Sequence, residues 1–240
     1  LKSLVLMGRC AFMLGRTSDA IKWLLECIST AETLGLPEQL AEAYNQLGNT
    51  YQVINDYGRS ISCYLDALDI IRDNRLIQLE GSILNNIGAL YMSLEDYDRA
   101  ADYFQQSYEK DKTVSNTSVI LLLNLASIYA KKRAFEKTDK YMASAREALN
   151  GEEELLMTAW CSLTEGEICQ AKGDMSKAIE HYKNVLRSDP ESVVGWSEVA
   201  GLLMDLGRYE ESLRSYERLK EIMPDDVPAL KGRMNVLAAL

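Results

Sequence analysis

The stretch Leu47-Gly48-Asn49-Thr50-Tyr51 is followed 40 residues later by Ile87-Gly88-Ala89-Leu90-Tyr91, so an apolar residue, a glycine and a tyrosine return at the same spacing. Leu125-Ala126 with Tyr129 repeats the pattern 38 residues further on, with alanine in place of the glycine. Repeats with a period of about 20–50 residues are typical of solenoids, in which similar units stack on one another. The sequence therefore predicts an array of repeats.

A second pattern follows the first in each unit. Small, large and small residues recur at spacings of four and three, which places them on one face of a helix. The members are Ser60, Tyr64 and Ala67, then Ala100, Phe104 and Ser107, then Thr138, Met142 and Ala145. Polar stretches such as Asn55-Asp56-Tyr57-Gly58 and Lys172-Gly173-Asp174 are typical of turns. Each unit is therefore predicted to be a helix, a turn and a second helix, in an all-α fold.

Two of the repeated positions are glycines inside predicted helices. A glycine in a helix costs about 1 kcal/mol relative to alanine, so its use at equivalent places needs a packing reason. We expect the second helix of each pair to approach the first closely at Gly48 and Gly88.

These residues resemble the tetratricopeptide-repeat (TPR) motif, W-x2-L-G-x2-Y followed by A-x3-F and P. The sixth unit matches it best, with Trp196, Val199-Ala200, Leu203, Ser212, Tyr216, Leu219 and Pro224. The resemblance implies an α-solenoid, a right-handed superhelix of antiparallel helix pairs that forms one array over residues 1–240. The expected units are 1–40, 41–80, 81–118, 119–158, 159–192 and 193–226, with a partial unit or cap at 227–240.

Composition narrows the possible partners. The formal net charge of −10 disfavours nucleic acid, because binding a phosphate backbone relies on clustered Lys and Arg. No run of about 18 apolar residues is present, so no membrane insertion is expected. Five cysteines with no C-x-x-C pair indicate neither a disulfide framework nor a zinc site, and a reducing, cytoplasmic location is expected.

No pattern of catalytic residues stands out. The sequence lacks a P-loop, a G-x-S-x-G, an H-E-x-x-H and a dinucleotide fingerprint. Its only histidine, His181, is expected to face solvent on a second helix. The chain is therefore interpreted as a non-enzyme without catalytic residues, metal ligands or cofactors.

The TPR resemblance also implies a concave groove lined by the first helix of each unit, where a peptide would bind. Amides are frequent at these inner positions, and a carboxamide can both donate to and accept from an extended peptide backbone. Larger side chains nearby would add specificity, and the two ends of the groove would differ in charge. The predicted peptide-binding residues are Asn45, Asn49, Asn85, Asn86, Asn124, Lys2, Arg9, Phe12, Met92, Trp160, Glu167, Glu198, Met204 and Asp205. The alternative is that the amides hydrogen-bond within the solenoid or face water.

The predicted function is a protein–protein interaction scaffold that binds an extended or helical segment of a partner in this groove. The alternative is a peptide-sensing regulatory domain of a larger signalling or transcription-regulating protein. Both use the same groove, so the sequence leaves the choice open, together with the partner's identity and the oligomeric state.

Overall fold

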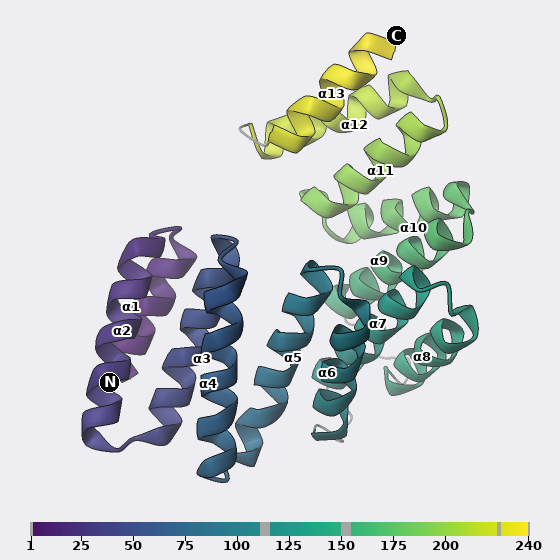
Figure 1. Ribbon diagram of the computed structural model, residues 1–240. Helices are drawn as coiled ribbons and strands as arrows, with labels where there is room; N and C mark the ends of the chain where they lie inside the picture. Colours follow the sequence, from purple (N-terminus) through teal and green to yellow (C-terminus); the bar gives the residue numbers. More distant parts are fainter. Residues whose placement is uncertain (1, 111–115, 150–154, 225–226, 240) are drawn as a thin grey trace. The chain divides into compact units, whose positions relative to one another are not determined.

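The computed structural model describes residues 2–110, 116–149, 155–224 and 227–239, and these residues form thirteen α-helices and no strand (Figure 1). The all-α prediction is confirmed. The helices are α1 Lys2–Met13, α2 Thr17–Leu34, α3 Pro37–Val53, α4 Tyr57–Asp73, α5 Ile77–Ser93, α6 Tyr97–Lys110, α7 Asn116–Lys131, α8 Phe135–Ala148, α9 Leu155–Lys172, α10 Met175–Ser188, α11 Val193–Asp205, α12 Tyr209–Ile222 and α13 Val227–Ala239. None of these helices is long and apolar enough to cross a membrane.

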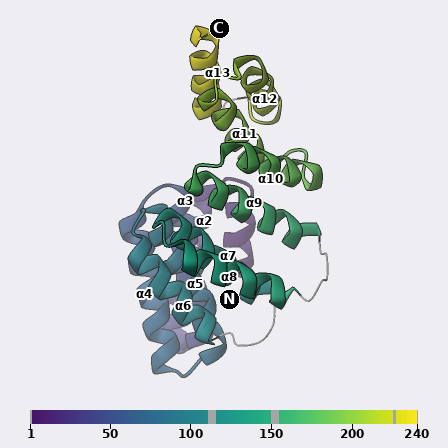
Figure 2. The same cartoon turned by 90° about the vertical axis from the view of Figure 1, so that its right-hand side faces the viewer.

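The chain divides into two compact units, an N-terminal unit of Leu1–Thr113 with α1–α6 and a C-terminal unit of Val114–Leu240 with α7–α13. Within each, odd-numbered helices are the first and even-numbered helices the second members of helix pairs. In the N-terminal unit consecutive helices pack side by side, each against the next (Figures 1 and 2). That one array runs over residues 1–240 stays a prediction.

A glycine marks the crossing of the two helices in several pairs. A Cβ built on Gly48 of α3 would lie 2.6 Å from Cε1 of Tyr64 on α4, and one on Gly88 of α5 would lie 2.9 Å from Cδ1 of Phe104 on α6. Both rings are fully buried. The close approach predicted at Gly48 and Gly88 is therefore confirmed, and it requires the absence of a side chain on the first helix.

The turn within each helix pair has one recurring conformation. At the end of α3, the N–H of Asn55 donates to the carbonyl of Gln52 and the N–H of Asp56 donates to that of Tyr51, both at 2.9 Å. Asn55 has a φ of 60°, and this combination is the Schellman motif that closes a helix. The left-handed residues of the six turns within pairs are Gly15, Asn55, Glu95, Arg133, Gly173 and Gly207.

In three of these turns, the residue that follows the left-handed residue is an aspartate that caps the N-terminus of the second helix. The Asp56 carboxylate accepts a hydrogen bond from the N–H of Arg59 at 3.1 Å, and Asp96 and Asp174 cap α6 and α10 in the same way. An aspartate at this place satisfies a backbone donor that the helix itself leaves free. The polar turns that the sequence predicted thus both end one helix and start the next.

One buried carboxylate links three helices of the N-terminal unit. Glu80, in the first turn of α5, is 6% exposed. Its Oε1 lies 3.0 Å from Nε of Arg72 on α4, and its Oε2 lies 2.7 Å from Nζ of Lys110 on α6. The ion pairs therefore join the second helices on either side of α5.

Candidate functional site

Three of the predicted amides meet on the first helices of the N-terminal unit. Nδ2 of Asn86 on α5 donates to Oδ1 of Asn45 on α3 at 2.8 Å, and Nδ2 of Asn85 donates to Oδ1 of Asn86 at 3.5 Å. All three side chains are half-buried. The Asn86–Asn45 bond connects neighbouring helix pairs, so these amides have a structural role and keep further donor and acceptor capacity.

A fourth amide serves the core of its own pair. The hydroxyl of the fully buried Tyr64 donates to Oδ1 of Asn49 at 2.6 Å and lies 3.0 Å from Oε1 of Gln52. A buried hydroxyl without a partner would be costly, and Asn49 provides that partner. Burial raises the pKa of Tyr64 to about 12, so the phenol stays protonated and remains a donor. The side chains of Asn45, Asn49 and Asn86 therefore form hydrogen bonds within the solenoid, as the alternative interpretation expected.

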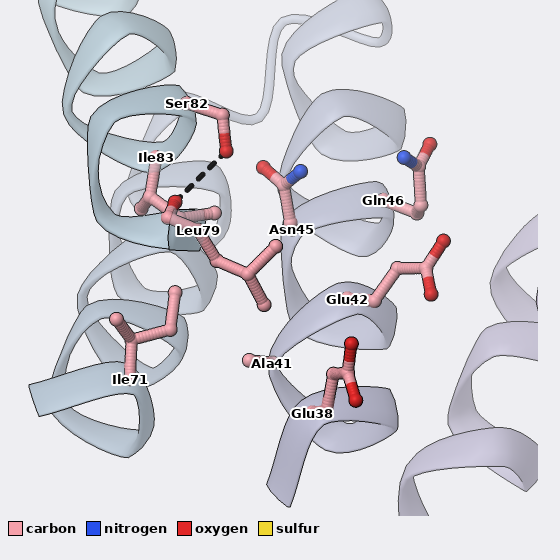
Figure 3. A pocket seen from close by; sticks show the side chains of 9 residues that line it. All are labelled: Glu38, Ala41, Glu42, Asn45, Gln46, Ile71, Leu79, Ser82 and Ile83. Atoms are coloured by element: carbon pink, nitrogen blue, oxygen red, sulfur yellow. Dashed lines mark hydrogen bonds between the residues drawn. The ribbon is translucent and has the colours of Figure 1, made fainter. Parts of the chain in front are cut away.

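A hollow of about 200 Å³, called here the central hollow, lies between α3 and α5 beside Asn45 (Figure 3). Its apolar part includes Leu79 and Ile83 of α5, and its polar part includes Glu38 and Glu42 of α3. In Figure 3 the side chain of Leu79 points into the space between the two helices. The hollow can therefore take an apolar group while amide and carboxylate oxygens lie at its border.

A second hollow, of about 460 Å³, lies near the turns that follow α1, α3 and α5. Phe12 of α1 and Asn49 of α3 both line it, together with the exposed Val53. The structure thus brings Phe12, predicted as a specificity residue, next to one of the predicted amides.

The other predicted residues of the N-terminal unit lie along the first helices. Arg9 is exposed on α1, and Met92 is half-buried near the end of α5. The side chain of Lys2 lies outside the described part of the chain. Of the two basic residues expected at this end of the groove, the structure therefore describes the side chain of Arg9, whereas two carboxylates, Glu38 and Glu42, border the central hollow.

The predicted carboxylates of the C-terminal unit lie on neighbouring first helices. The hydroxyl of Ser127 on α7 donates to Oε2 of Glu167 on α9. Burial raises the pKa of Glu198 on α11, the charge of Glu167 raises it further, and Lys131 opposes the shift. Glu167 and Glu198 therefore share one electrostatic environment, which favours cations.

The remaining predicted residues of this unit differ in exposure. Asn124 on α7 is half-buried, Trp160 on α9 is 37% exposed, and Asp205 is exposed at the end of α11. Met204 is partly buried against the core that Ala200 and Tyr216 form, so it contributes more to packing than to an open surface. No finding decides whether these residues bind a peptide, and they stay a predicted site.

Sequence reasoning missed part of the central hollow. Glu38 lies one helical turn before Glu42, and Leu79 and Ile83 come from the first half of α5. Extending the inner positions by one turn toward the start of each helix would have found Glu38.

The prediction that His181 faces solvent was wrong in part, because its Nδ1 lies 3.1 Å from Oε2 of Glu165 and its side chain is 29% exposed.

Family models for the tetratricopeptide repeat match residues 39–113 and 170–239, together more than half of the chain. The chain belongs to the TPR family. The glycine and aromatic residue at the crossings of three TPR helix pairs, α3–α4, α5–α6 and α9–α10, agree with the sequence signature from which the family was predicted.

This TPR chain also matches segments of longer proteins. It is 28% identical to the RNA polymerase-associated protein CTR9 of Caenorhabditis elegans over 66% of this chain and 12% of the relative. It is 24% identical to Superkiller protein 3 of Schizosaccharomyces pombe over 93% of this chain and 16% of the relative. The chain thus spans less than a fifth of the length of these two relatives.

A third relative is named as an enzyme. Human protein O-mannosyl-transferase TMTC1 is 20% identical over 93% of this chain and 23% of its own length. The interpretation of this TPR chain as a non-enzyme therefore stays a prediction, as does its cytoplasmic location.

Solved structures with the same fold support the assignment. The apo form of RapI aligns with a TM-score of 0.76 and 16% identity over 95% of this chain and 83% of RapI. A chain of the APC/C hetero-tetramer Cut9-Hcn1 aligns with a TM-score of 0.67 and 14% identity over 98% of this chain and 42% of its own length. At these identities the likeness shows the fold alone, an all-α TPR repeat fold.

Proposed function

We propose that the first helices of the N-terminal unit bind an extended or helical segment of a partner protein. The central hollow between α3 and α5 carries this proposal, because it combines an apolar recess with hydrogen-bonding groups at its border. A TPR protein is suited to such a role because its stacked helix pairs form a continuous surface for a long ligand.

The chemistry of the hollow indicates what the segment contains. Leu79 and Ile83 suit an apolar side chain, and the carboxylates of Glu38 and Glu42 suit a lysine or arginine next to it. Asn45 accepts from Asn86 through Oδ1, so its own Nδ2 donors are available for a backbone carbonyl. The expected ligand is therefore a segment with neighbouring apolar and basic residues.

Structural neighbours are consistent with this role. One solved structure is a Rap protein complexed with competence and sporulation factor, which aligns with 15% identity over 96% of this chain and 64% of that protein, with a TM-score of 0.73. Cut9 occurs in an assembly with Hcn1. Binding of another chain is a property of those proteins, and for this chain it is supported by the hollow.

Filling the hollow tests the proposal. Peptides selected from a random library on the wild-type chain are expected to lose at least about tenfold in affinity for Ser82→Trp, since Ser82 is exposed and lines the hollow. Ser62→Trp, on the exposed side of α4, is the control and should leave affinity unchanged. Fluorescence anisotropy measures both, and equal affinity for the wild type and both variants would place binding elsewhere.

The amides are tested separately. Asn45→Ala together with Asn86→Ala, both in the N-terminal unit, is expected to weaken binding of the same peptides by about 0.5–1.5 kcal/mol for each hydrogen bond lost. Asn86→Ala also removes the bond to Asn45, so thermal melting of both single variants serves as the control. A large fall in melting temperature with unchanged affinity would assign the amides to stability alone.

A further inference from the structure

A third hollow, on the C-terminal unit, has a different chemistry from the groove. It measures about 400 Å³ and is lined by residues of α10, α11 and α12. None of its lining residues belongs to the predicted groove. We call it the basic hollow, because Lys183, Arg187 and Arg214 contribute to its lining.

The floor of the basic hollow is apolar and ordered. Val199 and Leu203 are almost fully buried, at 1% and 2% exposure, whereas Leu186 and Trp196 are half-buried. Nε1 of Trp196 donates to the carbonyl of Pro190 at 2.9 Å, so the orientation of the indole is fixed. The floor therefore offers a preformed apolar surface. The volume of the basic hollow lies within the range of about 300–1,000 Å³ typical of ligand pockets.

The charge around this floor is positive in a chain that is otherwise acidic. The chain has 26 basic and 36 acidic residues, yet three basic side chains and only one acidic side chain line the basic hollow. The acidic side chain, Glu211, already forms an ion pair within the chain, because both its carboxylate oxygens lie 2.7 Å from guanidinium nitrogens of Arg208.

The three basic side chains have no carboxylate partner in the described part of the chain. Lys183 and Arg214 are exposed and form no ion pair there, and Nη1 of Arg187 donates to the amide oxygen of Asn184 at 2.5 Å. Positive charges without a carboxylate partner in the described part of the chain remain available to carboxylates of another molecule.

From this geometry we propose that the basic hollow docks an acidic segment of a partner protein, with one bulky apolar side chain inserted against the floor and carboxylates facing Lys183, Arg187 and Arg214. A buried apolar anchor inside a charged rim is the usual arrangement of a strong protein contact. The floor is mainly aliphatic and the chain carries a net charge of −10, which favours an acidic peptide over an extended phosphate backbone. The surface is independent of the central hollow.

The test uses a short fluorescein-labelled peptide in which one phenylalanine is flanked on both sides by glutamates. We expect saturable binding that weakens at least about tenfold for Lys183→Glu with Arg214→Glu, because two attractions become repulsions. Lys140→Glu with Lys220→Glu makes the same change of charge at exposed positions outside the hollow and should change affinity by less than about twofold. Replacing the peptide's phenylalanine by alanine should weaken binding to a similar degree.

A second measurement tests whether the peptide binds at the basic hollow. In a chain with Trp23→Phe and Trp160→Phe, the remaining Trp196 should change its fluorescence as the peptide binds. Absence of saturable binding, equal loss with both pairs of reversed charges, or loss with Ser82→Trp alone would overturn the proposal. Tighter binding of a single-stranded oligonucleotide would indicate that the basic hollow binds nucleic acid. Self-association abolished by Arg214→Glu would indicate that it binds a second copy of the chain. Either result would also overturn the proposal.

Discussion

Replacing Gly48 or Gly166 by alanine is expected to destabilise the protein by about 1–3 kcal/mol, although alanine is the better helix former. At each position the added Cβ would lie 2.6 Å from a ring carbon of a fully buried tyrosine, Tyr64 or Tyr182. Such a ring is held by the surrounding core and cannot retreat without disturbing it. Urea unfolding followed by circular dichroism measures the change.

Gly201 provides a matched control within α11. A Cβ there meets no atom within 4 Å, so Gly201→Ala is expected to stabilise the protein by about 0.5–1 kcal/mol. The same substitution is thus expected to lower the stability at a helix crossing and to raise it away from one. Stabilisation by all three variants would mean that the helices of a pair do not approach each other at these glycines.

The ion pairs of Glu80 are expected to make stability depend on pH. Glu80→Gln should cost about 1–3 kcal/mol at pH 7, because it removes two charge-assisted hydrogen bonds, and the lower half of this range is expected since Arg72 and Lys110 are 49% and 43% exposed. Burial alone would raise the pKa of Glu80, but the hydrogen bonds from Lys110 and Arg72 outweigh burial and lower it below its ordinary value of 4.5.

The direction of this pKa shift sets the pH window. A carboxyl whose pKa is lower in the folded state stabilises the fold above its unfolded pKa and loses this effect as the pH falls through the folded pKa. The difference between wild type and Glu80→Gln should therefore be constant above about pH 5 and shrink below pH 4.5. Glu109→Gln, at an exposed glutamate, should show no such change. A difference that stays constant down to acid unfolding would exclude this role of Glu80.

Local patterns allowed the helix pairs to be predicted, because their determinants lie close together in the sequence. Gly48 and Tyr64 are 16 residues apart and belong to one pair, and the turn at Asn55 carries its own signals. The bond from Asn86 to Asn45 could not be predicted, since it depends on how far one helix pair rotates against the next. The contact of His181 with Glu165 lies within one pair, between α10 and α9, and depends on the side-chain geometry at their interface.

The hollows were harder to predict than the helices for a related reason. Each is lined by residues from at least three elements, such as Lys183, Trp196 and Arg214 of the basic hollow, and every one of these residues is ordinary in its own helix. Single-helix periodicity indicates which face is buried but not which gaps remain between packed faces. The predicted amides were therefore placed on the correct helices, whereas the recess beside them was not foreseen.

The uniform turn within the helix pairs has a consequence for how such a chain evolves. The same hydrogen bonds close α1, α3, α5, α7, α9 and α11, whether the left-handed residue is Gly15, Asn55, Glu95, Arg133, Gly173 or Gly207. A gene crossover between two such turns would join the first helix of one repeat to the second helix of another in the correct register. Unequal recombination can therefore add or remove whole repeats and exchange the surfaces they carry, while the junction itself needs no new adaptation.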